Sequence, residues 1–131
     1  MRFKRAFTLL LADTMAVVGL LLSAGTAGAA ERDGVVEVGE FGLYYAPNSG
    51  LPVYDLYLSD PDFRGDRFPG SNLLVDNNTA SYWNRDSFWW HVYTGYNYTG
   101  SHGCLSSGYR GNASVTFRNT ISSARWLTTG C

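Results

Sequence analysis

The chain contains few of the residues and motifs on which most enzymes depend. It has two histidines and two cysteines, and it has no Gly-x-Ser-x-Gly elbow, zinc-protease helix or phosphate-binding glycine loop. His102 follows Ser101, but neighbours on a strand point to opposite faces, so this adjacency makes no catalytic dyad. We predict that His91 and His102 are partly exposed strand residues. We expect a protein that is not an enzyme and requires no cofactor.

Long apolar runs are absent except at the N-terminus. Positive residues at 2–5 precede an apolar run at 7–22, and small residues follow at 27–29, which is the pattern of a signal peptide. The run is shorter than the roughly 20 apolar residues that a membrane helix needs. We therefore predict that residues 1–30 are removed and that residues 31–131 form one secreted, extracellular domain.

Lysine is absent after Lys4, and arginine is the only basic residue type besides histidine in the predicted mature part. Residues 31–131 contain seven arginines and ten aspartates and glutamates, a balance of about three negative charges. A negative surface is unsuited to nucleic acid or to an anionic membrane. We expect neither as a partner.

Both cysteines, Cys104 and Cys131, belong to the predicted mature part. In an oxidising compartment we expect them to form a disulfide that stabilises the C-terminal half by ~3–4 kcal/mol. A zinc site is not expected, because this pair and two scattered histidines lack the short spacing of zinc motifs.

The sequence pattern after residue 30 is that of β structure. Short runs of Val, Tyr, Phe, Trp and Leu alternate with clusters of Gly, Pro, Asn, Asp and Ser, and no window has a sustained helical period. So many short strands predict an all-β sandwich of two sheets. The predicted strands are 35–38, 41–45, 53–57, 73–75, 81–84, 88–93, 101–105, 115–118 and 124–127.

The second half contains the signature of a bent hairpin. Tyr93 and Tyr98 can cover the bend with two rings, and Gly100 can adopt a positive φ. Ser122 follows Gly100 by 22 residues (122 − 100), and we predict that its hydroxyl bonds back to the hairpin.

The first half repeats this pattern in weaker form. Gly50 and Ser81 are 31 residues apart (81 − 50), which predicts an insertion in the loop at 59–66. Two Greek keys, about 37–86 and 89–128, are therefore expected.

These hairpins and the Asn119-x-x-Ser122-Ser123 ending resemble the Greek-key motif of the βγ-crystallins, including its calcium-binding members. Residues 39–45 (Gly-Glu-Phe-Gly-Leu-Tyr-Tyr) and 77–81 (Asn-Asn-x-Ala-Ser) are similar to those of the secreted bacterial peptidase inhibitors of the actinobacterial metalloproteinase inhibitor type. The resemblance implies a βγ-crystallin-like sandwich. It also implies an inhibitor of an extracellular protease, which we expect to act as a monomer.

The same resemblance implies a calcium site. Ca²⁺ takes six to eight oxygen ligands, which amide, hydroxyl and backbone carbonyl groups can supply. Arg118 and Tyr82 depart from the family pattern, so we expect weak binding. In the alternative interpretation these polar residues only brace the hairpins through hydrogen bonds to the backbone. The candidate ligands are Asn77, Asn78, Ser81, Asn119 and Ser122.

An inhibitor of this kind offers a rigid loop that fills a protease cleft. We predict that the inhibitory loop is the segment at 101–106, which Cys104 tethers. The acidic loop at 59–66 is the second candidate for the inhibitory loop. Two other functions stay open: a calcium-binding structural or stress protein, and a toxin or cell-wall-binding module that uses exposed aromatic residues such as Trp89 or Trp90. The predicted inhibitory residues are Ser101, His102, Gly103, Cys104, Leu105 and Ser106.

Overall fold

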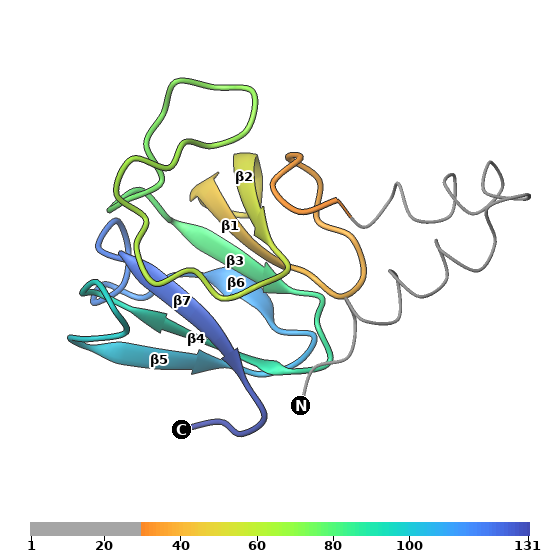
Figure 1. Ribbon diagram of the computed structural model, residues 1–131, viewed down its shortest axis with the longest axis vertical. Coiled ribbons are helices and arrows are strands. Elements are labelled where there is room, and N and C mark those ends of the chain that lie inside the picture. The colour runs from red at the N-terminus through yellow and green to blue at the C-terminus, as the bar shows by residue number, and fades with distance from the viewer. Residues whose placement is uncertain (1–29) are drawn as a thin grey trace, which may run out of the picture. The chain divides into compact units, whose positions relative to one another are not determined.

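The computed structural model describes residues 30–131, in which every regular element is a β-strand. The strands form two antiparallel sheets, with orders β2-β1-β3-β6 and β5-β4-β7 (Figure 1). The predicted all-β class is confirmed, and Glu31–Cys131 form one compact unit. The strands are β1 (Phe41–Ala46), β2 (Gly50–Leu56), β3 (Ser81–Asn84), β4 (Trp89–Tyr93), β5 (His102–Leu105), β6 (Arg110–Asn112) and β7 (Ser123–Leu127).

The predicted signal peptide, residues 1–30, lies outside the described residues except for Ala30. Among the residues that are described, no helix has the length and apolar character needed to cross a membrane.

Each half of the chain contributes a segment to the sheet of the other half. β6, from the second half, pairs with β3, so that Ser81 lies opposite Asn112. In return Asp60, from the first half, forms a bridge with Ala124 of β7. The two N···O distances of this bridge are 2.8 and 3.0 Å. The first sheet therefore includes a strand from the second half, and the second sheet is linked to the first half by one bridge.

Three of the predicted strands are not strands in the structure, and one strand of the structure was not predicted. Residues 35–38 contain no strand, and at 73–75 only Leu74 forms a single bridge. Residues 115–118 form turns in which Val115 is 86% exposed. β6 has the sequence Arg-Gly-Asn, so apolar content could not reveal it. A strand depends on a pairing partner as well as on composition.

The main core lies between the two sheets. Phe41 of β1 and Trp90 of β4 stack there, with ring centroids 4.8 Å apart. Trp89 is half-buried, and Gly130 lies against its ring, so the expected exposed aromatic platform at Trp89 is partly covered. The core residues are Phe41, Leu43, Tyr54, Leu56, Phe63, Phe68, Val75, Tyr82, Trp90, Val92, Leu105, Ala113, Ile121 and Ala124.

The β1–β2 hairpin is bent and is held by Ser81, as predicted. The Ser81 hydroxyl donates to the Ala46 carbonyl at 2.7 Å and accepts the Ser49 N–H at 3.0 Å. Asn48 and Ser49 both have φ of 58°, in the left-handed region. These two successive left-handed residues turn the chain, and the buried serine hydroxyl satisfies backbone groups that the bend leaves without strand partners.

The β4–β5 hairpin has the same design, but its serine is Ser123. The Ser123 hydroxyl donates to the Gly95 carbonyl at 2.7 Å and accepts the Tyr98 N–H at 3.1 Å. The prediction that Ser122 holds the hairpin is therefore wrong by one residue. Neighbours on an extended chain point in opposite directions, and the Ser122 hydroxyl instead donates to Asn77 Oδ1 at 3.3 Å.

Candidate functional site

The insertion predicted in the first half is a long segment, residues 57–80, between β2 and β3. Figure 1 shows it as the yellow-green to green loop between β2 and β3, whose outer part projects above the sheets. Phe63, Phe68 and Val75 are fully buried and fix the segment to the main core. Burial of three large apolar side chains is what allows so long a connection to be ordered, because it offsets the conformational entropy that ordering costs.

Residues 67–74, here called the tip, form the outer part of this segment. The Phe68 N–H donates to the Leu73 carbonyl at 2.9 Å, and Arg67 Nη1 donates to the Asn72 carbonyl at 2.6 Å. Leu73 and Leu74 are 38% and 44% exposed. The tip is thus a braced turn that presents two adjacent leucine side chains to solvent.

The base of the segment is held by a buried polar cluster. The Tyr54 hydroxyl lies 2.7 Å from Asp60 Oδ2 and 2.9 Å from Asp66 Oδ2. Burial raises the pKa of Asp60 to about 6. Arg32 Nη2 lies 3.4 Å from Asp60 Oδ2 and places a positive charge beside the cluster. These contacts fix the position from which the tip projects.

The predicted inhibitory loop at 101–106 is mostly a strand. His102–Leu105 form β5, which is an edge strand paired only with β4 in its sheet. Leu105 is buried in the main core. The strand predicted at 101–105 is therefore confirmed, and the alternative expectation of a loop here is wrong, because pairing with β4 keeps the backbone extended. The part that these residues have in inhibition stays a prediction.

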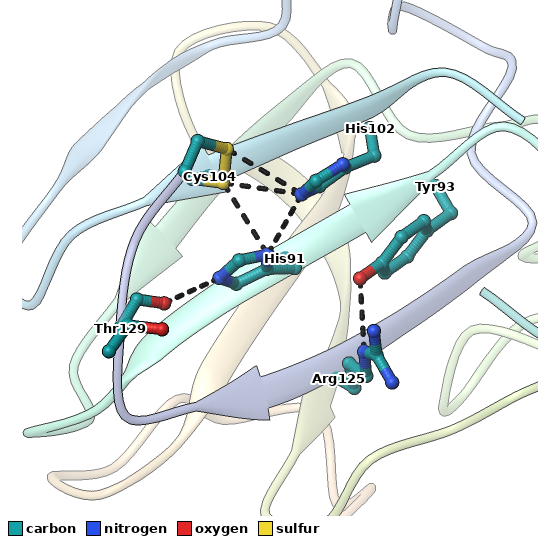
Figure 2. Close-up of a disulfide and its surroundings, with 7 residues drawn as sticks. His91, Tyr93, His102, Cys104, Arg125 and Thr129 are labelled. Carbon is teal, nitrogen blue, oxygen red and sulfur yellow. Dashed lines mark hydrogen bonds between the residues drawn. A yellow bond between two sulfur atoms is a disulfide. The ribbon is translucent and has the colours of Figure 1, made fainter. Parts of the chain in front are cut away.

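The Cys104–Cys131 disulfide is confirmed, with its Cα atoms 5.7 Å apart. Both histidines lie beside it (Figure 2): His91 Nδ1 is 3.0 Å from His102 Nε2, and Cys104 Sγ is 3.4 Å from His91 Nδ1 and 3.5 Å from His102 Nε2. Sequence reasoning treated these residues as scattered. The pairing of β4 with β5 places His91 directly opposite Cys104, which no local spacing reveals.

The prediction that both histidines are partly exposed is correct for His102 and wrong for His91. His91 is 3% exposed, and its Nε2 lies 2.7 Å from the Thr129 carbonyl oxygen. A carbonyl can only accept, so Nε2 carries the proton and Nδ1 is an acceptor when the ring is neutral. Burial lowers the pKa of His91 below its usual value.

The candidate calcium ligands lie on two adjoining segments. The Asn77 N–H donates to the Ile121 carbonyl at 3.0 Å, and the Asn119 N–H donates to the Thr79 carbonyl at 2.8 Å. Asn77 and Asn119 have φ of 61° and 59°. These reciprocal bonds bring Asn77 close to Ser122, whereas the Asn119 side chain is exposed.

Two of the candidate calcium ligands instead make hydrogen bonds that brace the backbone. Asn78 Nδ2 donates to the Leu74 carbonyl at 2.8 Å, and the Ser81 hydroxyl holds the β1–β2 hairpin. The structure adds Asp76, which sequence reasoning missed. Its Oδ2 accepts the Tyr96 hydroxyl at 3.0 Å, while its Oδ1 is buried without a hydrogen-bond partner among residues 30–131. Matching Ser81 with Ser123 aligns Asp76-Asn77 with Arg118-Asn119 and would have revealed it.

Comparison with known proteins identifies one family and one fold. The model of peptidase inhibitor family I36 matches residues 37–105, more than half of the chain. No curated protein is similar enough in sequence to count as a match.

Several solved βγ-crystallin structures resemble this chain. An archaeal βγ-crystallin is 22% identical, with a TM-score of 0.53, and the match covers 70% of this chain and 100% of that one. A βγ-crystallin from Ciona intestinalis is 16% identical, with a TM-score of 0.55 and coverage of 68% and 100%. A βγ-crystallin domain from Clostridium beijerinckii is 15% identical, with a TM-score of 0.56 and coverage of 69% and 99%. The predicted βγ-crystallin-like fold is therefore confirmed.

Proposed function

Because the chain belongs to peptidase inhibitor family I36, we propose that it inhibits an extracellular peptidase by inserting a rigid loop into the active-site cleft. The family match over residues 37–105 is the observation that carries this proposal. The predicted signal peptide supports an extracellular target, and we expect the inhibitor to act as a monomer.

The tip, residues 67–74, is the loop that fits this mechanism best. An inhibitory loop has to be ordered before it binds, because ordering on binding would weaken the complex. The tip is anchored by the buried side chain of its own Phe68 and by that of Val75, which follows it, and it is braced by its own hydrogen bonds. Its exposed Leu73 and Leu74 are apolar side chains of the kind that can fill a protease specificity pocket.

The other candidate segments are less suited to insertion. Residues 102–105 are paired in β5. In the acidic loop at 59–66, Phe63 and Asp60 are buried, so that part of the loop faces the core instead of solvent. We therefore prefer the tip to both.

Inhibition constants of the purified protein against a thermolysin-like metallopeptidase and a subtilisin-like serine peptidase test the proposal. We expect inhibition of at least one enzyme at submicromolar concentration. The double substitution Leu73→Ala, Leu74→Ala should weaken inhibition at least about 30-fold, which corresponds to a hot-spot loss of ~2 kcal/mol. Leu51→Ala is the matched control, because Leu51 is a leucine of β2 that is 71% exposed and lies outside the tip.

The possible results distinguish failure of the inhibitor proposal from a wrong choice of inhibitory loop. If neither peptidase is slowed at micromolar protein, the inhibitor proposal fails for these enzyme classes. If the double variant inhibits as well as the wild type, inhibition stands but the tip is not the loop, and residues 101–106 become the next candidate.

A second function, calcium-dependent stabilisation, is favoured by the buried Asp76 Oδ1, which has no partner among the described residues. We propose that Asp76, Asn77 and Ser122 supply side-chain oxygens to a weak Ca²⁺ site. An ion that binds only the folded state raises its stability. Millimolar Ca²⁺ should raise the Tm of the wild type and leave that of Asp76→Ala unchanged. The same Tm for the wild type in Ca²⁺ and in chelator would remove this candidate.

A further inference from the structure

Four potential metal ligands meet at the disulfide: His91 from β4, His102 and Cys104 from β5, and Cys131. Their ligand atoms all lie within 4.8 Å of one another. We propose that, once a dithiol reductant has opened the Cys104–Cys131 bond, these four side chains bind one zinc ion as a Cys2His2 site. This site would be distinct from the tip and from the calcium candidates.

The observed distances already approximate a zinc coordination shell. Tetrahedral zinc with Zn–N bonds of about 2.0–2.1 Å and Zn–S bonds of about 2.3 Å requires separations of about 3.3 Å between nitrogens and about 3.6 Å between nitrogen and sulfur. The two ring nitrogens are 3.0 Å apart. The distances from Cys104 Sγ to the nitrogens of His91 and His102 are 3.4 and 3.5 Å, and that from Cys131 Sγ to His102 Nε2 is 3.6 Å.

The two sulfurs are too close together for this shell. A disulfide holds its sulfurs about 2.05 Å apart, whereas two thiolates on tetrahedral zinc lie about 3.8 Å apart. Cys104 is held in β5, but Cys131 is exposed and lies beyond the end of β7 at Leu127. A shift of Cys131 alone can therefore open the shell and leave the two sheets in place.

The histidines are oriented for metal binding. Metal-ligating histidines characteristically donate their second ring N–H to a carbonyl or carboxylate. His91 Nε2 already makes this contact with the Thr129 carbonyl, which leaves Nδ1 directed at the cluster (Figure 2). The Tyr93 ring stacks on His102 with centroids 5.0 Å apart, and Arg125 Nε donates to the Tyr93 hydroxyl at 3.0 Å. This stack holds His102 Nε2 toward His91.

Protons and electrons balance in this conversion. The dithiol loses two electrons and two protons and becomes a disulfide, while Cys104 and Cys131 each become a thiol. Zinc binding releases both thiol protons to solvent, and the two thiolates neutralise the charge of Zn²⁺. The neutral His102 ring moves its proton from Nε2, where it bonds to His91 Nδ1 before metal binding, to Nδ1, so that both imidazoles bind as neutral ligands. Two sulfurs and two imidazoles in tetrahedral arrangement favour zinc over harder cations.

Cobalt(II) is a suitable spectroscopic probe for this site. The purified protein is reduced with an immobilised dithiol, separated from it without air, and titrated with Co²⁺. We expect one ion per chain, a thiolate-to-cobalt charge-transfer band, the intense visible bands of tetrahedral cobalt, and displacement by Zn²⁺. The oxidised protein should show no charge-transfer band. Absence of the charge-transfer band from the reduced protein as well would overturn the proposal.

Single substitutions test which side chains bind the metal ion. His102→Ala should weaken binding by more than about 100-fold, because loss of a ligand costs at least as much as loss of an outer-shell partner. His102 is exposed, so this variant keeps the core intact. Thr128→Ala, exposed in the segment that follows β7, is the control and should bind like the wild type. Equal affinity of His102→Ala and the wild type would overturn the site.

The folding of the reduced chain gives an independent measurement. Circular dichroism and the Tm should show that Zn²⁺ stabilises the reduced protein, or restores its structure if reduction alone unfolds it. A reduced chain whose Tm is the same with and without Zn²⁺, or that stays unfolded in both, would contradict the proposal.

Discussion

The two halves of this protein share one bent hairpin and differ in what surrounds it. Ser81 and Ser123 make the same pair of hydrogen bonds, at 2.7 and 3.0 Å in the first half and at 2.7 and 3.1 Å in the second. The first half adds the long segment at 57–80, whereas the second adds a disulfide and two stacked histidines. The shared part specifies the fold, and the candidate sites lie where the halves differ.

The halves also bury titratable groups of opposite kinds. Glu40 and Asp55 are fully buried in the first half, and burial raises the pKa of Glu40 to about 8 and that of Asp55 to about 6. In the second half the buried group is His91, whose pKa burial lowers. The two halves should therefore respond to pH in opposite directions.

The largest effect is expected at the contact between the halves. Trp90→Ala should reduce the free energy of unfolding by about 3–5 kcal/mol, because it removes a fully buried ring that stacks on Phe41. Urea denaturation followed by tryptophan fluorescence and by circular dichroism measures this. Both signals should report one transition, since β6 of the second half pairs with β3 and Asp60 of the first half forms a bridge with β7. Two separate transitions would show that the halves are independent.

Removal of the disulfide should act on the second half. The double variant Cys104→Ser, Cys131→Ser loses a cross-link between residues 27 apart in sequence, and we expect a loss of about 3–4 kcal/mol. Hydrogen exchange should show β5 losing protection while β1 and β2 change least. Equal loss of protection in all strands would contradict a constraint local to the second half.

The two hairpin serines should be equivalent. Ser81→Ala and Ser123→Ala each remove two hydrogen bonds from a buried hydroxyl, and each should cost about 1–3 kcal/mol in chemical denaturation. Ser122→Ala is the matched control with an expected cost below about 1 kcal/mol, because its hydroxyl makes one long hydrogen bond of 3.3 Å. A larger effect at Ser122 than at Ser123 would restore the register expected from the sequence.

The smallest effect is the pH dependence, with Glu40→Gln as the test. Carboxyl groups of unfolded chains titrate near pH 4, and the raised pKa of about 8 means that folded Glu40 holds its proton more tightly. Its contribution to stability is therefore complete below about pH 4 and is lost as pH rises through about 8. Glu40→Gln should flatten this decline, as measured by denaturation at several pH values.

His91 supplies the opposite slope. Its lowered pKa means that the unfolded chain binds the proton more tightly. The contribution of His91 to stability is therefore complete above about pH 6.5 and is lost as pH falls toward the folded pKa.

If Glu40→Gln and the wild type have the same pH profile of stability, the carboxyl of Glu40 does not control the loss of stability at rising pH.

Much of the fold could be predicted from local sequence. The strand predicted at 81–84 coincides with β3, and Gly100 has the expected positive φ, here 82°. The site was predicted less well. Asn77 and Ser122 do meet, but Asp76 was missed because the two halves were aligned one residue out of register. The tip was missed because Leu73 and Leu74 were interpreted as part of a strand.

The sequence by itself determined the all-β class, the two hairpins and the pairing of the only two cysteines. Those features depend on alternation, on turn residues and on which residue types are present, and all of these are local or compositional. Only the tertiary structure decided which serine faces the hairpin, which strand crosses to the other sheet, and that His91, His102, Cys104 and Cys131 meet. Strand register sets these outcomes through contacts between distant residues, and a shift of one residue reverses the direction of every side chain.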